Sequence, residues 1–103
     1  MKERQILAIV KEPGKMPRVE PLFENSLHSL QETVGGCIET VTLCSDLVII
    51  CNEEGRLMGQ PHNCEVAGVD FVGTIVAVGT KGEDFASLKA SLVPGVLKML
   101  GDK

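Results

Sequence analysis

The stretch that decides the fold is residues 5–10, Gln-Ile-Leu-Ala-Ile-Val, which is apolar on both alternating faces of an extended chain. Its branched side chains favour a strand, and a strand that is apolar on both faces is covered on both faces. Residues 71–78 read Phe-Val-Gly-Thr-Ile-Val-Ala-Val and repeat this pattern. We therefore expect two central strands in one sheet, with Gly73 marking a bulge or a close approach of another backbone.

The segment between residues 12 and 23 predicts a turn followed by an edge strand. Residues 12–15 read Glu-Pro-Gly-Lys, in which proline fixes one backbone dihedral and glycine supplies a positive one. We expect residues 18–23 to fold back on the first strand. Pro17 and Pro21 lack the N–H that a central ladder requires, so this strand should lie at an edge of the sheet.

Two amphipathic helices are expected. The first is about ten residues long, begins after a cap at Asn25 or Ser26, and ends at the two glycines of residues 35–36. The second begins near Ser91, because Pro94 is tolerated in the first turn of a helix but costs about 3 kcal/mol in its interior. The apolar residues that line one face are Leu27, Leu30 and Val34 in the first helix, and Leu92, Val96, Leu97 and Leu100 in the second.

Residues 37–51 predict a hairpin with a two-residue turn at Ser45 and Asp46. This register pairs Leu43 with Val48, Val41 with Ile50 and Thr40 with Cys51, so that Val41, Leu43, Val48 and Ile50 share one face while Thr40, Thr42 and Ile49 share the other. The four cysteines, Cys37, Cys44, Cys51 and Cys64, contain no Cys-x-x-Cys pair, and none faces another in this register. We therefore expect buried free thiols, without a disulfide or a metal site.

These elements predict an α+β fold in a single domain, residues 1–103, because a chain of 103 residues is too short for two hydrophobic cores. The expected order is β-β-α-β-β-β-α, with two helices over one side of a mainly antiparallel five-stranded sheet. Aromatic residues are only 3% of the chain. The core is therefore aliphatic, and few rings are available to stack on bases.

The charge of the chain limits its partners. Ten Lys and Arg against 14 Asp and Glu give a net charge of -4, which disfavours duplex nucleic acid. No apolar run approaches the roughly 20 residues that span a bilayer, and no secretory signal precedes the first strand, so we expect a cytoplasmic protein without a membrane contact. Residues 1–18 hold five basic and two acidic residues, a balance of +3 that leaves -7 for the rest. The basic segment suits a small anion or an acidic partner, or it only guards an edge strand.

Residues 52–70 are the candidate site, because nearly twenty residues with little periodicity form a long connection for so small a domain. Gly55 and Gly59 free the backbone to present N–H groups, and Arg56 offers a planar fork for phosphate or carboxylate. Asparagine side chains can recognise amide or base edges. The candidate ligand-binding residues are Asn52, Glu53, Gly55, Arg56, Gly59, Pro61, His62 and Asn63.

The same segment also has plainer interpretations. Residues 52–55 are typical of a surface turn, and residues 61–63 of a structural kink. Glu53 and Glu54 lack further carboxylates at ligand spacing, so no metal site is assigned. His62 and Cys64 share a face of an extended segment, but no third residue is marked to orient the imidazole. We expect no catalytic residue and no cofactor.

Four segments of the chain resemble a known family. Residues 34–39 read V-G-G-C-I-E, residues 49–63 read I-I-C-N-E-E-G-R-L-M-G-Q-P-H-N, residues 72–74 read V-G-T, and residues 82–88 read G-E-D-F-A-S-L. They are similar to a small family of bacterial and phage proteins of about this length that is described as a domain of unknown function. This chain has Arg56 where the family usually has lysine, and Cys64 where a basic residue often follows the asparagine. The resemblance implies carriage by phages or other mobile elements, and it supplies no reaction.

Two functional hypotheses follow. The first is a phage or mobile-element accessory protein that binds and sequesters a small anionic ligand, such as a nucleotide signal of host defence, without catalysis. A homo-oligomer would help it, since loops from two protomers can enclose more than one shallow domain does. The alternative is a protein–protein inhibitor or adaptor that acts on a host enzyme through its acidic surface, or as a mimic of nucleic acid. A regulatory domain with a metabolite ligand is a third, less specific hypothesis.

Overall fold

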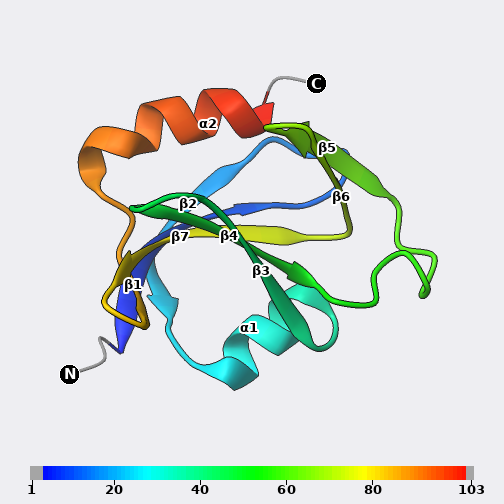
Figure 1. Ribbon diagram of the computed structural model, residues 1–103, viewed down its shortest axis with the longest axis horizontal. Coiled ribbons are helices and arrows are strands. Elements are labelled where there is room, and N and C mark those ends of the chain that lie inside the picture. The colour runs from blue at the N-terminus through cyan, green and yellow to red at the C-terminus, as the bar shows by residue number, and fades with distance from the viewer. Residues whose placement is uncertain (1–3, 102–103) are drawn as a thin grey trace.

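The structure is a computed structural model that describes residues 4–101. Its main sheet has the strand order β2-β1-β7-β4-β3, and every neighbouring pair is antiparallel. A sixth strand, β8, pairs with β7 and lies off this path. Figure 1 shows the sheet between two helices. The strands are β1 (Gln5–Lys11), β2 (Arg18–Glu24), β3 (Ile38–Cys44), β4 (Leu47–Asn52), β7 (Ile75–Lys81) and β8 (Asp84–Ala86).

The two apolar stretches form central strands, as the sequence predicts. β1 lies between β2 and β7, and β7 lies between β1 and β4. Successive residues of β1 belong to different cores: Ala8 and Val10 pack on one face of the sheet, and Ile9 packs on the other. The edge position predicted for residues 18–23 is also confirmed, since β2 is the first strand of the order.

The helices cover opposite faces of the sheet, so the prediction that both lie over one side is wrong. Helix α1 (Leu27–Val34) buries Leu30 and Val34 in one core, whereas α2 (Val93–Gly101) buries Val96 and Leu100 in the other. Figure 1 shows α2 above the sheet and α1 below it. The physical reason is present in residues 5–10, because a strand that is apolar on both faces requires a cover on each.

The helix termini follow the predicted chemistry. The Ser26 hydroxyl accepts a hydrogen bond from the N–H of Ser29 at 3.0 Å, and Gly35 ends α1 in the left-handed conformation with φ 86°. The helix has eight residues, and Leu27 is 56% exposed rather than part of the apolar face. A 3₁₀ turn at Ala90–Leu92 precedes α2, which places Pro94 in its first turn.

The register of the β3–β4 hairpin differs from the prediction by one residue. The turn at residues 45–46 is as expected and pairs Cys44 with Leu47, but a bulge between Thr42 and Cys44 then shifts the ladder. As a result Thr40 faces Ile50, Val41 faces Ile49 and Glu39 faces Cys51. Val41 and Leu43 therefore lie on the α2 side of the sheet with Ile49, not with Val48 and Ile50.

A second, two-stranded sheet was not expected from the sequence. β5 (His62–Val66) and β6 (Val69–Val72) form a hairpin whose turn, Ala67 and Gly68, has positive φ at both residues, 52° and 81°. The strand predicted over residues 71–78 is consequently divided between β6 and β7 at Gly73. The hairpin packs on the α2 side, where Cys64, Val66 and Phe71 join that core. In the described part of the chain, no helix is long and apolar enough to cross a bilayer.

Candidate functional site

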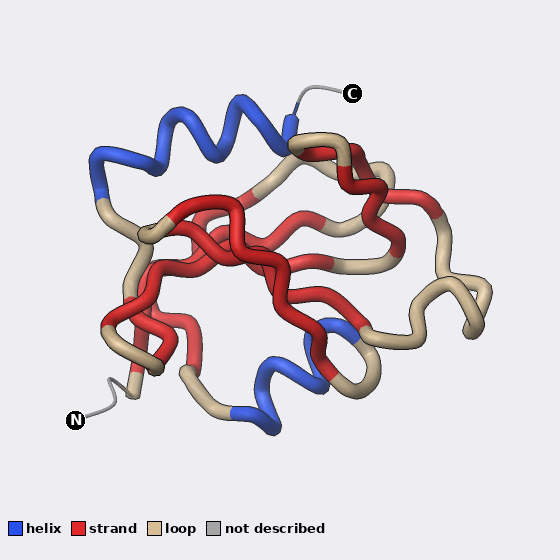
Figure 2. The backbone as a smooth tube through the Cα atoms, in the orientation of Figure 1, coloured by secondary structure: helices blue, strands red, loops and turns tan. Residues whose placement is uncertain are grey.

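Asn52, the last residue of β4, fixes the start of the loop formed by residues 53–61. Its Oδ1 accepts a hydrogen bond from the N–H of Glu54 at 2.8 Å, and its Nδ2 donates to the carbonyl of Val34 at 3.3 Å. The side chain is buried. Both ends of the amide are thus engaged in holding the turn, which is the plainer of the two roles that the sequence allows. Figure 2 shows the loop as a tan segment that extends beyond the sheet.

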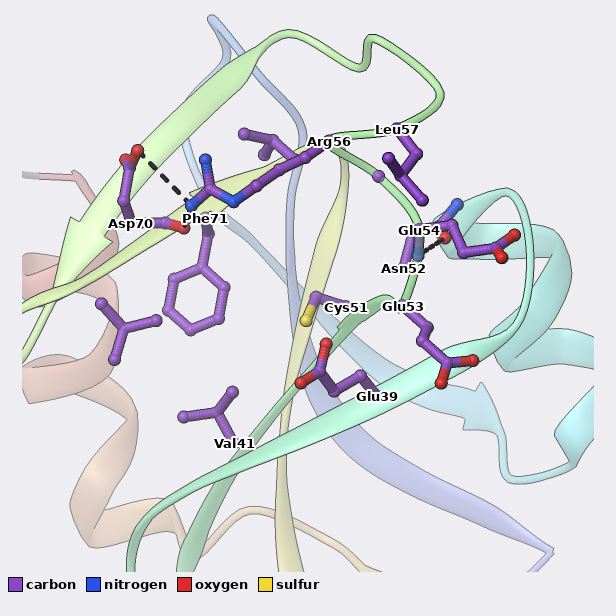
Figure 3. A pocket seen from close by; sticks show the side chains of 13 residues that line it. Glu39, Val41, Cys51, Asn52, Glu53, Glu54, Arg56, Leu57, Asp70 and Phe71 are labelled. Carbon is purple, nitrogen blue, oxygen red and sulfur yellow. Dashed lines mark hydrogen bonds and ion pairs between the residues drawn. The ribbon is translucent and has the colours of Figure 1, made fainter.

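A pocket of about 440 Å³ lies between this loop, β3, the end of β4, and β6, and we call it the loop pocket. Figure 3 shows Val41 and Phe71 pointing into it from opposite sides. Its charged lining residues are one guanidinium, that of Arg56, and four carboxylates, those of Glu39, Glu53, Glu54 and Asp70. The lining therefore has a formal charge of -3, which disfavours an anion.

Arg56 is held by Asp70 and does not point freely at a ligand. Its Nη2 donates to the Asp70 carbonyl at 2.6 Å and lies 3.6 Å from the Asp70 Oδ2, as Figure 3 shows. Asp70 also pairs with His62, since its Oδ1 lies 2.9 Å from the His62 Nδ1. The expected presentation of a lone guanidinium to an anion is therefore not what the structure shows at this pocket.

The two glycines and the proline of the loop have structural roles: Gly55 permits close packing, Gly59 adopts a left-handed conformation, and Pro61 accepts a backbone hydrogen bond. Gly55 is buried, and a Cβ added there would lie 2.9 Å from both Gln60 Oε1 and Val72 Cγ2. Gly59 has φ 73° and faces open space. The carbonyl of Pro61 accepts a hydrogen bond from the N–H of Gly73 at 2.8 Å. Neither Gly59 nor Pro61 lines a described cavity.

His62 and Asn63 line a second cavity, of about 400 Å³, on the other side of the β5–β6 hairpin. We call it the Lys11 cavity. The end of β1, the β1–β2 turn, β5 and the end of α2 form its walls. The charged residues among its described lining are Lys11, Lys15 and Glu65, so its formal charge is +1 with His62 neutral. The eight predicted residues thus divide between two sites of opposite charge and a set of packing residues.

Lys11, which lines this cavity, is only 5% exposed. Its Nζ donates to the Asn63 Oδ1 at 3.0 Å and to the Glu12 carbonyl at 3.1 Å. No carboxylate of the described residues lies within ion-pair distance of it. Asn63 in turn donates to the carbonyls of Lys11 and Gly73, at 2.8 and 2.7 Å. A buried ammonium that has only two neutral acceptors keeps one N–H for a further acceptor.

Sequence reasoning did not single out Lys11 or Lys15 and missed the cavity between them. It left two interpretations of the basic segment that holds both lysines: a site for a small anion or an acidic partner, and a solvated edge. One signal was available: Lys11 directly follows the run of residues 5–10, which is apolar on both faces, and alternation places it on the face of Ile9. The β5–β6 hairpin, which brings Asn63 to the lysine, was not predicted from the sequence.

The cysteines divide by strand position. Cys37 and Cys44 are exposed, which corrects the expectation of four buried thiols, whereas Cys51 and Cys64 are buried. Burial raises the pKa of both buried thiols. For Cys64, Lys11 acts in the opposite direction and Asp70 adds to the rise. All four are free, and the described residues contain no group of three or more His, Cys, Asp or Glu that could hold a metal ion.

Comparison with known proteins gives one match. Residues 4–101 match the family described as a domain of unknown function, DUF3846. No curated protein and no solved structure matches the chain. The match covers all the residues that form the sheet, the two helices and both cavities. The chain therefore belongs to the DUF3846 family, which agrees with the resemblance of its four segments.

Proposed function

We propose that the protein is a binding module for a small anionic ligand, without catalysis, and that the Lys11 cavity holds the anion. The observation that carries this proposal is the Lys11 ammonium: buried, bonded to two neutral oxygens, and without a carboxylate partner among the described residues. Burying a charge without a counter-ion is costly. A ligand carboxylate, sulfate or phosphate group on Lys11 would remove that cost.

The charge of the cavity supports an anion there and not in the loop pocket. Glu65 is the one carboxylate among the described lining of the Lys11 cavity. Lys15 also lines the cavity and is paired outside it, since its Nζ lies 3.5 Å from the Glu12 Oε1, so Lys11 is the lysine there without a carboxylate partner among the described residues. The loop pocket has four carboxylates for one guanidinium. The sign of the local potential therefore selects the Lys11 cavity, although residues 52–63 contribute only His62 and Asn63 to it.

The walls of the cavity suggest the class of ligand. A volume of about 400 Å³ is within the range of small-molecule sites, and Leu100 and Met16 offer apolar surface beside the lysines. This combination suits a molecule with one anionic group and an apolar or planar body. A mononucleotide is one member of that class. The accessory role in phages stays a prediction that comes from the resemblance, and the sequestration of a nucleotide signal of host defence stays a prediction from the sequence.

Titration calorimetry, which measures binding, and thermal denaturation, which measures the melting temperature, test the proposal with phosphate, sulfate, acetate and adenosine monophosphate as probes. We expect at least one of them to bind the wild type and to raise its melting temperature, since an anion at a hundred times its Kd adds about 2.7 kcal/mol to the stability of the folded state. Lys11→Met should abolish both effects. Lys98→Met removes the same charge from an exposed position on α2 outside the cavity and should retain them.

Two results would count against the site. One is equal stabilisation of the wild type and Lys11→Met by every anion, which would show a general salt effect. The other is a silent panel, with no heat and no shift for the wild type.

A further inference from the structure

The outer edge of β3 is an open ladder. The N–H of Glu53 donates to the carbonyl of Cys37 at 2.8 Å, which makes residues 37 and 53 a hydrogen-bonded pair, and the register continues with Glu39 opposite Cys51 and Val41 opposite Ile49. Antiparallel pairs alternate, so the N–H and C=O groups of Ile38, Thr40 and Thr42 point away from β4. β3 is the last strand of the order, and these groups have no hydrogen-bond partner among the described residues.

The two edges of the sheet differ in protection. β2 contains Pro21, and charged residues stand at alternate positions along it, at Arg18, Glu20 and Glu24. Proline and charged residues on an edge strand are typical protection against unwanted strand pairing. β3 contains no proline and no lysine, and its one charged residue is Glu39. The bulge after Thr42 limits the straight part of this edge to Ile38–Thr42, a length that admits one extended segment of about five residues.

The open edge adjoins the loop pocket. Glu39 and Val41 belong to β3 and also line the pocket. A strand added beside β3 would project alternate side chains on the same face as these two residues, at the border of the pocket. The lining there combines apolar Val41 and Phe71 with four carboxylates, which suits a side chain with an aliphatic stem and a cationic end.

We propose that the β3 edge and the loop pocket together form a docking site for an extended basic segment of a partner protein. The segment adds as the next antiparallel or parallel strand, with its backbone on Ile38, Thr40 and Thr42 and a lysine or arginine in the loop pocket. Charge complementarity selects this occupant over a second copy of the chain, because the β3 of a second copy would bring another Glu39 to an already acidic pocket.

Fluorescence anisotropy with a labelled nine-residue peptide of alternating lysine and valine tests the docking site. We expect this peptide to bind with an affinity that falls as salt rises, and the same peptide with glutamate for lysine not to bind. The basic peptide with all of its backbone amides N-methylated has no N–H to donate to β3 in either register, and it should not bind. Thr40→Pro removes one outward N–H but no bond to β4, and should weaken binding about tenfold relative to Thr40→Ala, which keeps the amide.

A second pair of variants tests the pocket. Glu53→Gln with Glu54→Gln should weaken the basic peptide about threefold or more, while Glu83→Gln with Asp84→Asn, which removes two adjacent exposed charges elsewhere, should leave its affinity unchanged. Circular dichroism checks that every variant is folded. The proposal is overturned if the basic peptide does not bind at millimolar concentration, if both peptides bind equally, or if Thr40→Pro and Thr40→Ala bind equally. A wild-type dimer that Thr40→Pro dissolves would also overturn it, since a second copy would then occupy the edge.

Discussion

Asn63 connects three segments that are distant in the sequence. Its one side chain accepts from Lys11 Nζ and donates to the carbonyls of Lys11 and Gly73, so it ties β1, β5 and the connection between β6 and β7 together. We predict that Asn63→Ala lowers the free energy of unfolding by about 2–4 kcal/mol, because it leaves buried groups without partners. Urea denaturation measures this, with exposed Gln5→Ala as the control. A loss below about 0.5 kcal/mol, as at an ordinary surface position, would contradict the network.

Gly73 is required for two separate reasons. Its φ is 71°, and an added Cβ would clash with Gln60 Oε1. We predict that Gly73→Ala costs about 2–3 kcal/mol, whereas Gly59→Ala, with φ 73° and open space around it, costs only the left-handed penalty of about 1 kcal/mol. Thermal unfolding of both variants separates the clash from the backbone strain. Equal losses would show that Gln60 moves aside without cost.

The buried thiols predict a loss of stability at high pH. The pKa of Cys51 and of Cys64 is raised in the folded state by burial, so the folded state holds these protons more tightly than the unfolded chain. Their contribution is complete below the ordinary thiol pKa and is lost as the pH rises through the raised values, from about pH 9 upward. Unfolding free energies measured between pH 7.5 and 10 should fall more steeply for the wild type than for Cys51→Ala with Cys64→Ala. Parallel curves would contradict this linkage.

The candidate site could be predicted only in part, for reasons visible at single residues. Asparagine is a residue type that often forms turns. The sequence positions of Asn52 and Asn63 do not indicate that Asn52 fixes the start of a loop while Asn63 accepts a hydrogen bond from a buried lysine. An arginine such as Arg56 suits an anion, but here its guanidinium is paired with Asp70. Asp70 is 14 residues away in the sequence, and the β5–β6 hairpin brings it next to Arg56. Charge partners set by tertiary structure are invisible to local patterns.

Each helix stabilises a different face of the sheet. Leu30 of α1 and Leu100 of α2 are both fully buried, in separate cores, whereas Leu27 at the start of α1 is exposed. We predict that Leu30→Ala and Leu100→Ala each cost about 2–5 kcal/mol, while Leu27→Ala changes the stability by less than about 0.5 kcal/mol. Urea denaturation with a common m-value measures all three. A small loss for either buried leucine would mean that its helix does not pack on the sheet as described.

Elements with long or strongly punctuated patterns were predictable, and short ones were not. A run that is apolar on both faces predicts β1, and the prolines predict the edge strand β2 and the start of α2. Ser26 and Gly35 mark the two ends of α1. β5, β6 and β8 are three to five residues long, too short for periodicity to distinguish them from loop. The turn of Ala67 and Gly68 was the one local signal for the β5–β6 hairpin. The predicted β3–β4 register was wrong because the bulge between Thr42 and Cys44 adds a residue to β3, and the composition of the hairpin does not indicate a bulge.

At the scale of the whole molecule, the β5–β6 hairpin separates two cavities of opposite charge. The loop pocket carries a formal charge of -3 and the Lys11 cavity +1, and Asp70 touches residues of both, Arg56 on one side and His62 on the other. Both cavities lie on the same side of the sheet as α2, and our proposals assign a basic segment of a partner protein to the first and a small anion to the second. The chain is acidic overall and yet keeps a buried lysine without a carboxylate partner among residues 4–101.

Anomalous diffraction from a crystal soaked in selenate tests the central claim most directly, since selenate carries the charge and shape of sulfate and can be located by its selenium. The account predicts a peak in the Lys11 cavity with a selenate oxygen within hydrogen-bond distance of Lys11 Nζ, and no such peak in crystals of Lys11→Met. A selenate bound at Arg56 in the loop pocket, with the Lys11 cavity empty, would contradict it.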